Sequence, residues 1–255
     1  MSIYFQPTRL VGAITLSMGF SSPVFAQDQT TTHTLDTIVV TATRSEQKIE
    51  TVPARISIIA PKTVAQSPIA ALPQLLQTDA SINMAQSGGY GQQSSIFLRG
   101  SNSTHTLLLK NGVRLNSNTS GGASLPFIDT TDIQQIEVLK GPASVLYGTD
   151  AIGGVVQLIS KTPEKTSAFI SAEMGENKTY KSVLGADVAE NGFYAQVRGQ
   201  RLETDGTAAT DAKNSKKASF DQKGYSVKLG VEQQNYATSI DYSENKGHSD
   251  YDSWG

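Results

Sequence analysis

An alternation with a period of two residues runs through the last third of the sequence, and it constrains the fold more than any other feature. In residues 193–200 and 225–232, apolar and polar side chains take turns along the chain. Weaker versions occur in residues 168–174, 182–188 and 236–242. Because a strand places successive side chains on opposite faces, this region is predicted to form about five strands, each with an apolar and a polar face.

The connectors between these predicted strands differ in length. Residues 190–192 are a tight turn, whereas residues 203–224 are long, polar and rich in Asp and Lys. Short turns at one end and long loops at the other are typical of transmembrane β-barrels in outer membranes. A soluble β-sandwich is the alternative interpretation of the same alternation.

Five strands are too few to close a barrel. Bacterial single-chain barrels have an even number of strands, from about 8 upward. The last residues, 249–255 (SDYDSWG), are predicted to be a loop rather than a strand. We therefore expect that the barrel is incomplete and that the chain is truncated relative to a working protein.

The N-terminus has the pattern of a secretory signal peptide. Arg9 is followed by an apolar run at residues 10–20, and small residues precede a cleavage site after Ala26. The run is shorter than the roughly 20 residues that a membrane-spanning helix needs. A buried N-terminal helix is the alternative. The pattern predicts removal of residues 1–26 and an exported protein that is either soluble or a β-barrel.

Composition and motifs exclude several classes of function. The chain has no cysteine, which excludes disulfides, thiol catalysis and thiolate metal sites. Its net charge of -2 offers no basic field to nucleic acid. The sequence has no G-x-S-x-G, Walker or H-E-x-x-H motif, and its three histidines lie in separate segments. We therefore expect that the protein is not an enzyme.

Residues 27–50 are predicted to be a tether that precedes the first domain. Residues 27–35 (QDQTTTHTL) are polar, with nothing to bury. Residues 36–44 (DTIVVTATR) are rich in β-branched side chains, which favour an extended backbone. The second stretch is therefore predicted to be a strand that awaits a partner. An edge strand of the following domain is the alternative.

Residues 51–165 have the pattern of a small domain that mixes helices and strands. Strands are expected at residues 55–59, 94–99, 136–140 and 155–160, a hairpin at 106–115, and short helices at 69–77 and 142–147. The clearest local signal is Asn111-Gly112 between two apolar runs. Both residues accept the positive φ angles that a type I′ hairpin turn requires.

The motifs of this domain resemble those of the TonB-dependent receptors. The similar segments are DTIVVTA at 36–42, SSIFLRG at 94–100, LLKNGVRL at 108–115 and IEVLKGPASVLYGTDAIGGVVQLISK at 136–161. The resemblance implies an α+β plug domain at residues 51–165, followed by the first antiparallel strands of a transmembrane β-barrel at 166–255. In that family a 22-stranded barrel surrounds the plug in the outer membrane of Gram-negative bacteria, with the plug facing the periplasm.

The resemblance also implies how import would be driven. The segment DTIVVTA looks like the TonB box, through which TonB would transmit energy from the inner-membrane proton gradient. An extended segment binds by adding a strand to its partner's sheet, and pulling on it would shift or unfold part of the plug. The predicted TonB box consists of Asp36, Thr37, Ile38, Val39, Val40, Thr41 and Ala42.

Within the family, the chain is most similar to the vitamin B12 receptors, in SGGYGQQSSIFLRG, NGVRLN and GPASVLYGTDAIGGVVQLIS. The similarity implies a corrinoid ligand held by two plug loops, at 87–95 and 116–124. The candidate ligand contacts are Ser87, Tyr90, Gln92, Gln93, Ser94, Thr119, Ser120 and Gly121. Glycines let the backbone approach a bulky ligand, and amides and hydroxyls offer it hydrogen bonds. A ferric siderophore as the cargo, solvated loops without a ligand, and a non-transporting fragment are the alternatives.

Two further predictions concern charged residues. Related B12 receptors bind Ca²⁺ through aspartates in this region, which implies a metal site of Asp205, Asp211 and Asp221, since calcium favours oxygen ligands. Three solvated aspartates are the alternative. Arg99, in a predicted plug strand, would need a carboxylate partner from the barrel wall. An arginine exposed to the lumen is the alternative there.

Overall fold

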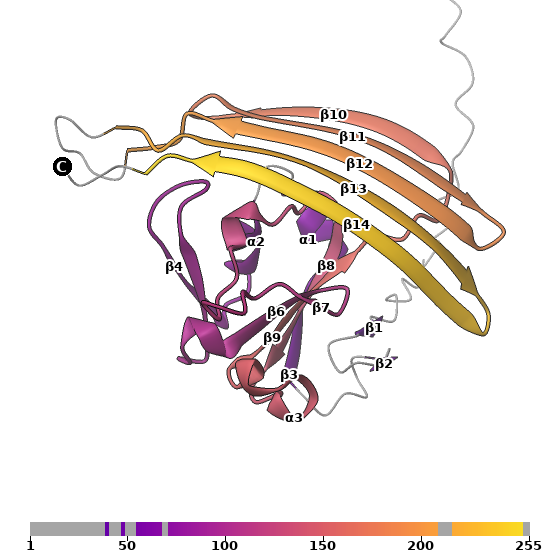
Figure 1. Ribbon diagram of the computed structural model, residues 1–255, viewed down its shortest axis with the longest axis horizontal. Helices are drawn as coiled ribbons and strands as arrows, with labels where there is room; N and C mark the ends of the chain where they lie inside the picture. The colour runs from indigo at the N-terminus through magenta and orange to yellow at the C-terminus, as the bar shows by residue number, and fades with distance from the viewer. Residues whose placement is uncertain (1–38, 41–46, 49–54, 68–70, 209–215, 252–255) are drawn as a thin grey trace, which may run out of the picture. The chain divides into compact units, whose positions relative to one another are not determined.

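A computed structural model of the chain describes residues 39–40, 47–48, 55–67, 71–208 and 216–251. All of them belong to one compact unit, Thr37–Gly255. The predicted signal peptide and most of the predicted tether lie outside the described residues. Two five-stranded sheets dominate the structure, one in each of the two regions that the sequence distinguishes (Figure 1).

The N-terminal domain is built on a mixed sheet with the strand order β3-β8-β9-β6-β7. Neighbouring strands are antiparallel except β6 and β9, which are parallel. The strands are β3 (Arg55–Ile59), β6 (Thr106–Lys110), β7 (Val113–Arg114), β8 (Ile133–Lys140) and β9 (Gly154–Ser160). The strands β6 and β9 are near-continuous apolar runs because both of their faces are buried.

Short helices and a separate hairpin complete this domain. They are α1 (Pro61–Ala65), α2 (Leu72–Leu76), α3 (Ser144–Tyr147), the hairpin β4 (Ile82–Gln86) and β5 (Ser94–Leu98), and the 3-10 turns η2 (Ser103–His105), η3 (Leu125–Phe127) and η4 (Thr149–Ala151). Helices α1 and α2 carry a proline in the first turn, where its missing N–H leaves no hydrogen bond unmade. The sequence pattern predicted neither α1 nor β4.

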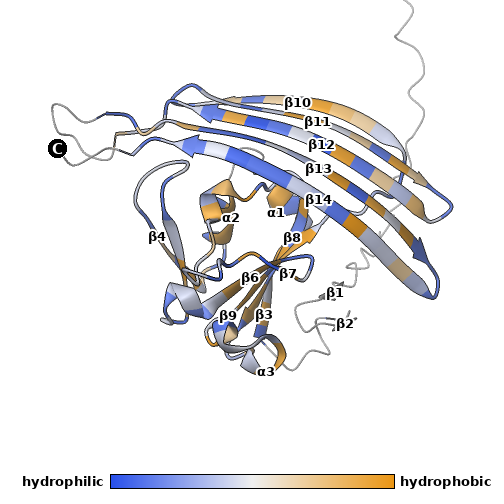
Figure 2. Cartoon of the chain, viewed as in Figure 1, coloured by the Kyte–Doolittle hydropathy of each residue, from blue (hydrophilic) through white to orange (hydrophobic). Residues whose placement is uncertain are grey.

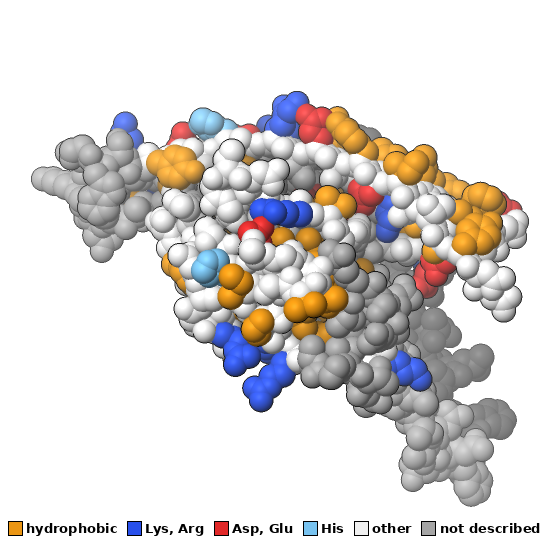
Figure 3. All heavy atoms as spheres, turned by 60° about the horizontal axis from the view of Figure 1, so that its bottom comes forward, with side chains coloured by type: hydrophobic (Ala, Val, Ile, Leu, Met, Phe, Trp, Pro, Cys, Tyr) orange, Lys and Arg blue, Asp and Glu red, His pale blue; other side chains and the backbone are white. Residues whose placement is uncertain are grey.

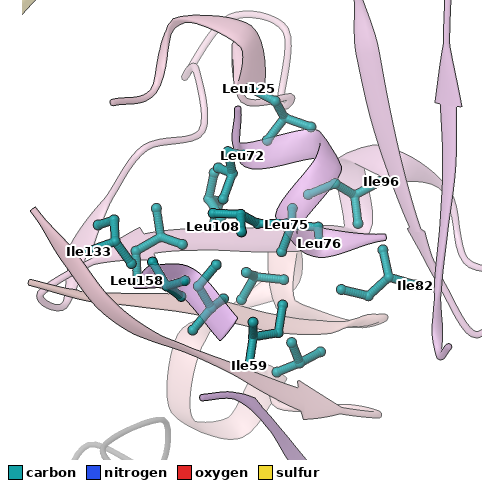
Figure 4. Packing of buried hydrophobic residues seen from close by; sticks show 14 of the residues in the cluster. Ile59, Leu72, Leu75, Leu76, Ile82, Ile96, Leu108, Leu125, Ile133 and Leu158 are labelled. Carbon is teal, nitrogen blue, oxygen red and sulfur yellow. The ribbon is translucent and has the colours of Figure 1, made fainter. Parts of the chain in front are cut away.

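The main hydrophobic core lies between α2 and one face of this sheet. Leu72, Leu75 and Leu76 of α2 are almost fully buried and pack with Leu108 and Leu158 of the sheet (Figure 4). A smaller apolar cluster covers the opposite face of the sheet. Burying one such leucine contributes roughly 1.5–3 kcal/mol. The loops described below therefore start and end on a well-packed support.

The predicted hairpin turn is present between β6 and β7. Asn111 and Gly112 have φ angles of 48° and 81°, as a type I′ turn requires. The side chain of Asn111 also joins the turn to the end of β9. Its amide donates to Ser160 Oγ (2.8 Å), and its Oδ1 accepts the Ser160 N–H (3.0 Å).

The C-terminal region is an up-and-down antiparallel sheet with the strand order β10-β11-β12-β13-β14 (Figure 1). The strands are β10 (Ser167–Gly175), β11 (Thr179–Glu190), β12 (Phe193–Thr204), β13 (Phe220–Gln233) and β14 (Tyr236–Ser249). Within the described residues β10 and β14 do not pair with each other, so the sheet is open. The predicted fold class, an α+β domain followed by antiparallel strands of an incomplete barrel, is confirmed.

The two faces of this sheet differ as the alternation predicted. Leu229 and Ile240 are paired across β13 and β14, and both are exposed. Arg198 and Ser226 are paired across β12 and β13 on the opposite face, and both are buried. Figure 2 shows apolar and polar residues alternating along these strands, and Figure 3 shows apolar side chains gathered along the sheet. One face is thus an apolar surface, whereas the other is polar and is buried in β11, β12 and β13.

Some predicted boundaries are wrong. Strand β12 continues to Thr204 and β13 begins at Phe220, so the long connector is 205–219 and Asp221 lies in a strand. Arg99 follows the end of β5, with a φ of 53° and an exposed side chain, so it does not lie in the strand; a carboxylate partner from the barrel wall stays a prediction. Among the described residues, no helix has the length and apolar character needed to cross a membrane.

Candidate functional site

A hollow of about 370 Å³ opens among the loops of the N-terminal domain. It is lined by the β4–β5 connector, the segment from η2 to β6, the residues after the β6–β7 hairpin, and a residue that follows β14. Its polar and aromatic side chains include Gln93, Ser94, Ser103, Thr104, Ser120, Phe127 and Tyr251. Segments far apart in the sequence therefore meet at one place.

Asn116 determines the shape of the second predicted ligand loop. Only 6 % of its surface is exposed. Its Oδ1 accepts the Leu108 N–H (2.7 Å), and its Nδ2 donates to the carbonyls of Thr106 (3.0 Å) and Gly121 (2.9 Å). These bonds tie the loop directly to β6, a core strand of the sheet.

The first predicted loop, residues 87–95, includes the connector 87–93 between β4 and β5, which is closed by its own hydrogen bonds. The Ser87 N–H donates to the Gln93 carbonyl (3.0 Å), and Gln86 Nε2 donates to the Gly89 carbonyl (2.8 Å). Gly91 has a φ of 76°, which glycine adopts at no steric cost. The loop is thus a defined turn between β4 and β5.

Neighbouring glutamines in this loop have different surroundings. Gln93 is exposed and lines the hollow. Gln92 is 5 % exposed, and its Nε2 donates to Ser249 Oγ (3.1 Å) and to the carbonyl of Asp250 (2.9 Å). The amide nitrogen of Gln92 therefore holds the loop against the end of β14.

The hollow brings together three of the eight predicted ligand contacts, Gln93, Ser94 and Ser120. The other five do not line it: Ser87 and Thr119 are exposed, Tyr90 and Gly121 are half-buried, and Gln92 is buried. Burial raises the pKa of the Tyr90 hydroxyl, so it stays protonated at neutral pH. Contact between any of these residues and a ligand stays a prediction.

The chemistry of the hollow is neutral. Its described lining carries hydroxyl and amide groups beside apolar carbon, and no charged side chain. Sequence reasoning missed Ser103, Thr104 and Tyr251. The run Asn102–Thr104 held a signal, because Asn102 is a good helix cap and its side chain accepts the Thr104 N–H (3.2 Å) at the start of η2.

Comparison with known proteins agrees with this architecture. Residues 48–155 match the family model of the TonB-dependent Receptor Plug Domain. The vitamin B12 transporter BtuB of Vibrio vulnificus strain YJ016 is 47% identical over 125 residues, which are 49% of this chain and 20% of that protein. Residues 48–155 of this chain are thus a plug domain of the TonB-dependent receptor type.

A second relative matches a longer stretch of this chain. The vitamin B12 transporter BtuB of Vibrio vulnificus strain CMCP6 is 36% identical over 175 residues, 68% of this chain and 29% of that protein. The chain thus spans less than a third of either relative. The pyoverdine receptor FpvA of Pseudomonas aeruginosa PAO1, solved with pyoverdine, superposes with a TM-score of 0.68 at 14% identity, over 83% of this chain and 30% of that one. This likeness shows the fold.

The predicted TonB box lies mostly outside the described residues. Of its seven residues, the structure describes Val39 and Val40, which form the strand β1 (Val39–Val40). This strand pairs antiparallel with β2 (Gln47–Lys48). The segment is therefore extended at the two described positions.

The predicted calcium ligands are separated by the strand boundaries. Asp205 follows β12 and forms a salt bridge with Lys178 (2.9 Å), Asp221 lies in β13, and Asp211 lies outside the described residues. The Lys178 ammonium holds the pKa of Asp205 below its ordinary value. The described residues contain no group of three or more His, Cys, Asp or Glu able to hold a metal.

A buried ionic contact joins the plug to the sheet, and sequence reasoning missed it. Arg198 of β12 places Nε 3.3 Å from Asp132 Oδ1 of the plug and Nη2 2.7 Å from Asp187 Oδ1 of β11. The Ser226 hydroxyl donates to Asp132 Oδ2 (2.5 Å). Burial raises the pKa of Asp132 despite this hydrogen bond. The arginine comes from the sheet and the carboxylate from the plug, the reverse of the arrangement considered for Arg99.

A second polar contact lies nearby. Lys228 of β13 is 7 % exposed, and its Nζ donates to Ser160 Oγ (3.0 Å) and to the Lys161 carbonyl (3.1 Å). Gln222 of the same strand donates to the Phe127 carbonyl (2.8 Å). The polar residues of the sheet thus find their partners in the second half of the plug.

Proposed function

We propose that this chain is the N-terminal part of a TonB-dependent outer-membrane receptor that imports a corrinoid of the vitamin B12 type. The observation that carries the proposal is the 47% identity with a vitamin B12 transporter over 125 residues. The sheet supports a place in the outer membrane, because one face is apolar and exposed and the other polar and covered.

The hollow supports a ligand of this class. Corrinoids carry amide side chains around a bulky ring, and such groups both donate and accept hydrogen bonds. The lining offers the amide of Gln93 and the hydroxyls of Ser94, Thr104 and Ser120. A volume of about 370 Å³ admits only part of so large a molecule, so the rest of the ligand would lie above the plug.

A ferric siderophore is the other cargo considered. The likeness to the pyoverdine receptor rests on 14% identity and concerns the fold. Anionic ferric complexes are best held by arginine and lysine, and the described lining of the hollow has neither. We therefore favour the corrinoid, with the siderophore as the other outcome of the test below.

Energy would reach the receptor through the TonB box. Asp36 to Ala42 would add as a strand to a sheet of TonB, and backbone hydrogen bonds would supply the grip. The extended backbone at Val39 and Val40 supports this role. The inner-membrane proton gradient would then pull on the plug from the periplasmic side.

Calcium is a separate proposal for the connector 205–219. Asp205, Asp211 and Asp221 would supply its oxygen ligands, and the cation would have to displace Lys178 from Asp205. Calcium titration of wild type and Lys178→Met tests this point. Tighter binding in the variant is expected, whereas no saturable binding in either protein would remove the proposal.

The function is tested on outer membranes of the native cell. A plug-derived peptide first identifies the receptor and its mass, and a species no heavier than this chain would remove the transport proposal. Binding of labelled cyanocobalamin is then measured with unlabelled cyanocobalamin or a ferric siderophore as competitor. Competition by cyanocobalamin alone is expected, and competition by the siderophore alone would overturn the corrinoid assignment.

A pair of variants locates the site. Gly122→Tyr places a ring at the hollow, where an added Cβ meets no atom within 4 Å. It should abolish cyanocobalamin binding by filling the space. Gln134→Tyr adds the same ring at an exposed position on β8 outside the hollow and should leave binding unchanged.

A further inference from the structure

Phe220 is the first residue of β13 and contacts the first loop of the hollow and the 3-10 turn η3, which directly follows the second loop. Its side chain is 2 % exposed. The ring lies 5.7 Å from that of Phe127, between centroids, at an interplanar angle of 58°. On its other side lies Gly91, where an added Cβ would overlap the Phe220 ring. One aromatic side chain of the sheet thus lies against both walls of the hollow.

The contact at Gly91 depends on glycine. Its φ of 76° disfavours other residues, and an added Cβ would also lie 2.7 Å from Ser249 Oγ. The next residue, Gln92, donates to Ser249 and Asp250 as described above. The first loop is therefore packed against β13 and β14 by shape and by hydrogen bonds.

Phe127 also contacts both β13 and β14. Besides the Phe220 ring, the backbone of Phe127 accepts a hydrogen bond from Gln222, two residues further along β13. An added Cβ on Gly247 of β14 would lie 2.9 Å from the Phe127 ring. The turn η3, which directly follows the second loop, thus lies against the same two strands as the first loop.

We propose that Phe220 is a positioning residue that sets the spacing between the two ligand loops. Gly91 and Phe127 both line the hollow, one in each wall, and Phe220 contacts both. Phe220 directly follows the connector 205–219, so a change in the connector would be passed to the hollow through this side chain. Thr207 Oγ1 in the connector lies 3.2 Å from where a Cβ on Gly89 would stand. The identity of the ligand rests on the proposed function, whereas the spacing does not.

Spin labels on the two loops measure this spacing. The chain has no cysteine, so Gln93→Cys and Gly122→Cys provide two specific labelling positions within it. Both residues line the hollow, and an added Cβ at Gly122 meets open space. Double electron–electron resonance on the purified receptor then reports the distance between the loops in wild type, Phe220→Leu, Phe220→Ala and Phe193→Ala. Phe193 is the control, a phenylalanine of β12 that is 64% exposed.

The expected result is a narrow distance distribution in wild type, a broader one in Phe220→Leu and the broadest in Phe220→Ala. Cyanocobalamin affinity, measured on the same Phe220 and Phe193 variants without the two cysteines and their labels, should fall in the same order, by about tenfold in Phe220→Ala, since disordered loops must be fixed on binding. Phe193→Ala should change neither. An unchanged distribution in the Phe220 variants, or equal broadening in Phe193→Ala, would overturn the proposal.

The distance between the labels and the affinity for cyanocobalamin are separate readouts, so the role of Phe220 can be tested independently of the proposed cargo. If Phe220→Ala does not fold, Phe220→Leu decides the result alone. If wild type fails to bind cyanocobalamin, the proposed cargo is wrong, but the distances between the labels still decide the role of Phe220.

Discussion

The guanidinium of Arg198 lies 3.3 Å from the carboxylate of Asp132, and this pair joins the plug to the sheet. The same guanidinium contacts Asp187 on the neighbouring strand (2.7 Å). All three side chains are largely buried. One cation is therefore shared between a carboxylate of the sheet and a carboxylate of the plug.

Replacing Arg198 with methionine should destabilise the protein by about 3–5 kcal/mol, because it leaves two carboxylates buried without their cation. Equilibrium unfolding of the purified protein in urea measures the change. Arg201→Met, at an exposed arginine of the same strand, is the matched control and should cost less than about 1 kcal/mol. Equal losses in the two variants would show that the buried pair has no special weight.

Asp132→Asn should have a smaller effect than Arg198→Met. The asparagine oxygen still accepts the Ser226 hydroxyl, and Arg198 keeps its contact with Asp187. A loss of about 1–3 kcal/mol is expected from the same urea experiment. A larger loss of unfolding free energy than in Arg198→Met would indicate that another partner of Asp132 contributes more to stability than Arg198 does.

This pair also shows where sequence reasoning stops. The alternation in β12 and β13 predicted that Arg198 and Ser226 share the polar face, and they do. The partner Asp132 is 66 residues away from Arg198 in the sequence, and no local pattern connects them. For Arg99 the same reasoning predicted a strand position, whereas β5 ends at Leu98 and the side chain is exposed.

Asp79 predicts a pH dependence of stability. Burial raises its pKa, but hydrogen bonds from Ser57 and Ser81 and the nearby Lys140 outweigh burial, so the pKa is lowered. Since the folded protein holds this carboxylate ionised, its contribution is complete above the ordinary pKa of 3.8 and is lost as the pH falls through the lowered value. Asp79→Asn should therefore cost about 1–3 kcal/mol at neutral pH and progressively less on acidification.

Urea unfolding at a series of pH values checks this expectation. Ser57→Ala removes one donor to Asp79 and keeps the carboxylate, so it should show a weaker form of the same pH dependence. A difference between wild type and Asp79→Asn that stays constant down to the lowest pH would contradict the assignment.

Asn116 offers a test of loop shape. Asn116→Asp keeps the oxygen that accepts the Leu108 N–H but loses the donors to Thr106 and Gly121. Cyanocobalamin affinity should fall by about tenfold or more, since the carbonyls of Thr106 and Gly121 both lose this donor. Asn118→Asp, an exposed position in the same loop, is the control. Binding that is unaffected in Asn116→Asp would mean that this loop does not hold the ligand.

The TonB box is tested with proline. Val40→Pro removes a backbone N–H, and hence a hydrogen bond of any strand added to TonB. Uptake of labelled cyanocobalamin by cells should be lost, while binding to isolated membranes should be unchanged. Thr31→Pro, in the polar stretch before the box, should preserve both. Uptake that survives in Val40→Pro would contradict the mechanism.

The candidate site was predictable in part. The two loops were predicted from the resemblance to the vitamin B12 receptors, and their glycines beside amide and hydroxyl residues suit that role. Which side chains face the hollow could not, because this depends on how each loop packs. Gln92 and Gln93 are adjacent and chemically identical, yet one is bonded to the end of β14 and the other lines the hollow.

Lys228 holds the C-terminal end of the plug, and this affects how the plug would refold into place after import. Lys228 bonds Ser160 and Lys161, only a few residues before β10 begins at Ser167, so covalent and polar attachment coincide at that end. A pull on the tether would act at the opposite end of the domain. Segments detached by that pull would stay covalently linked to the part of the plug that remains in place. Resealing the pore would then be a fast intramolecular step rather than a search.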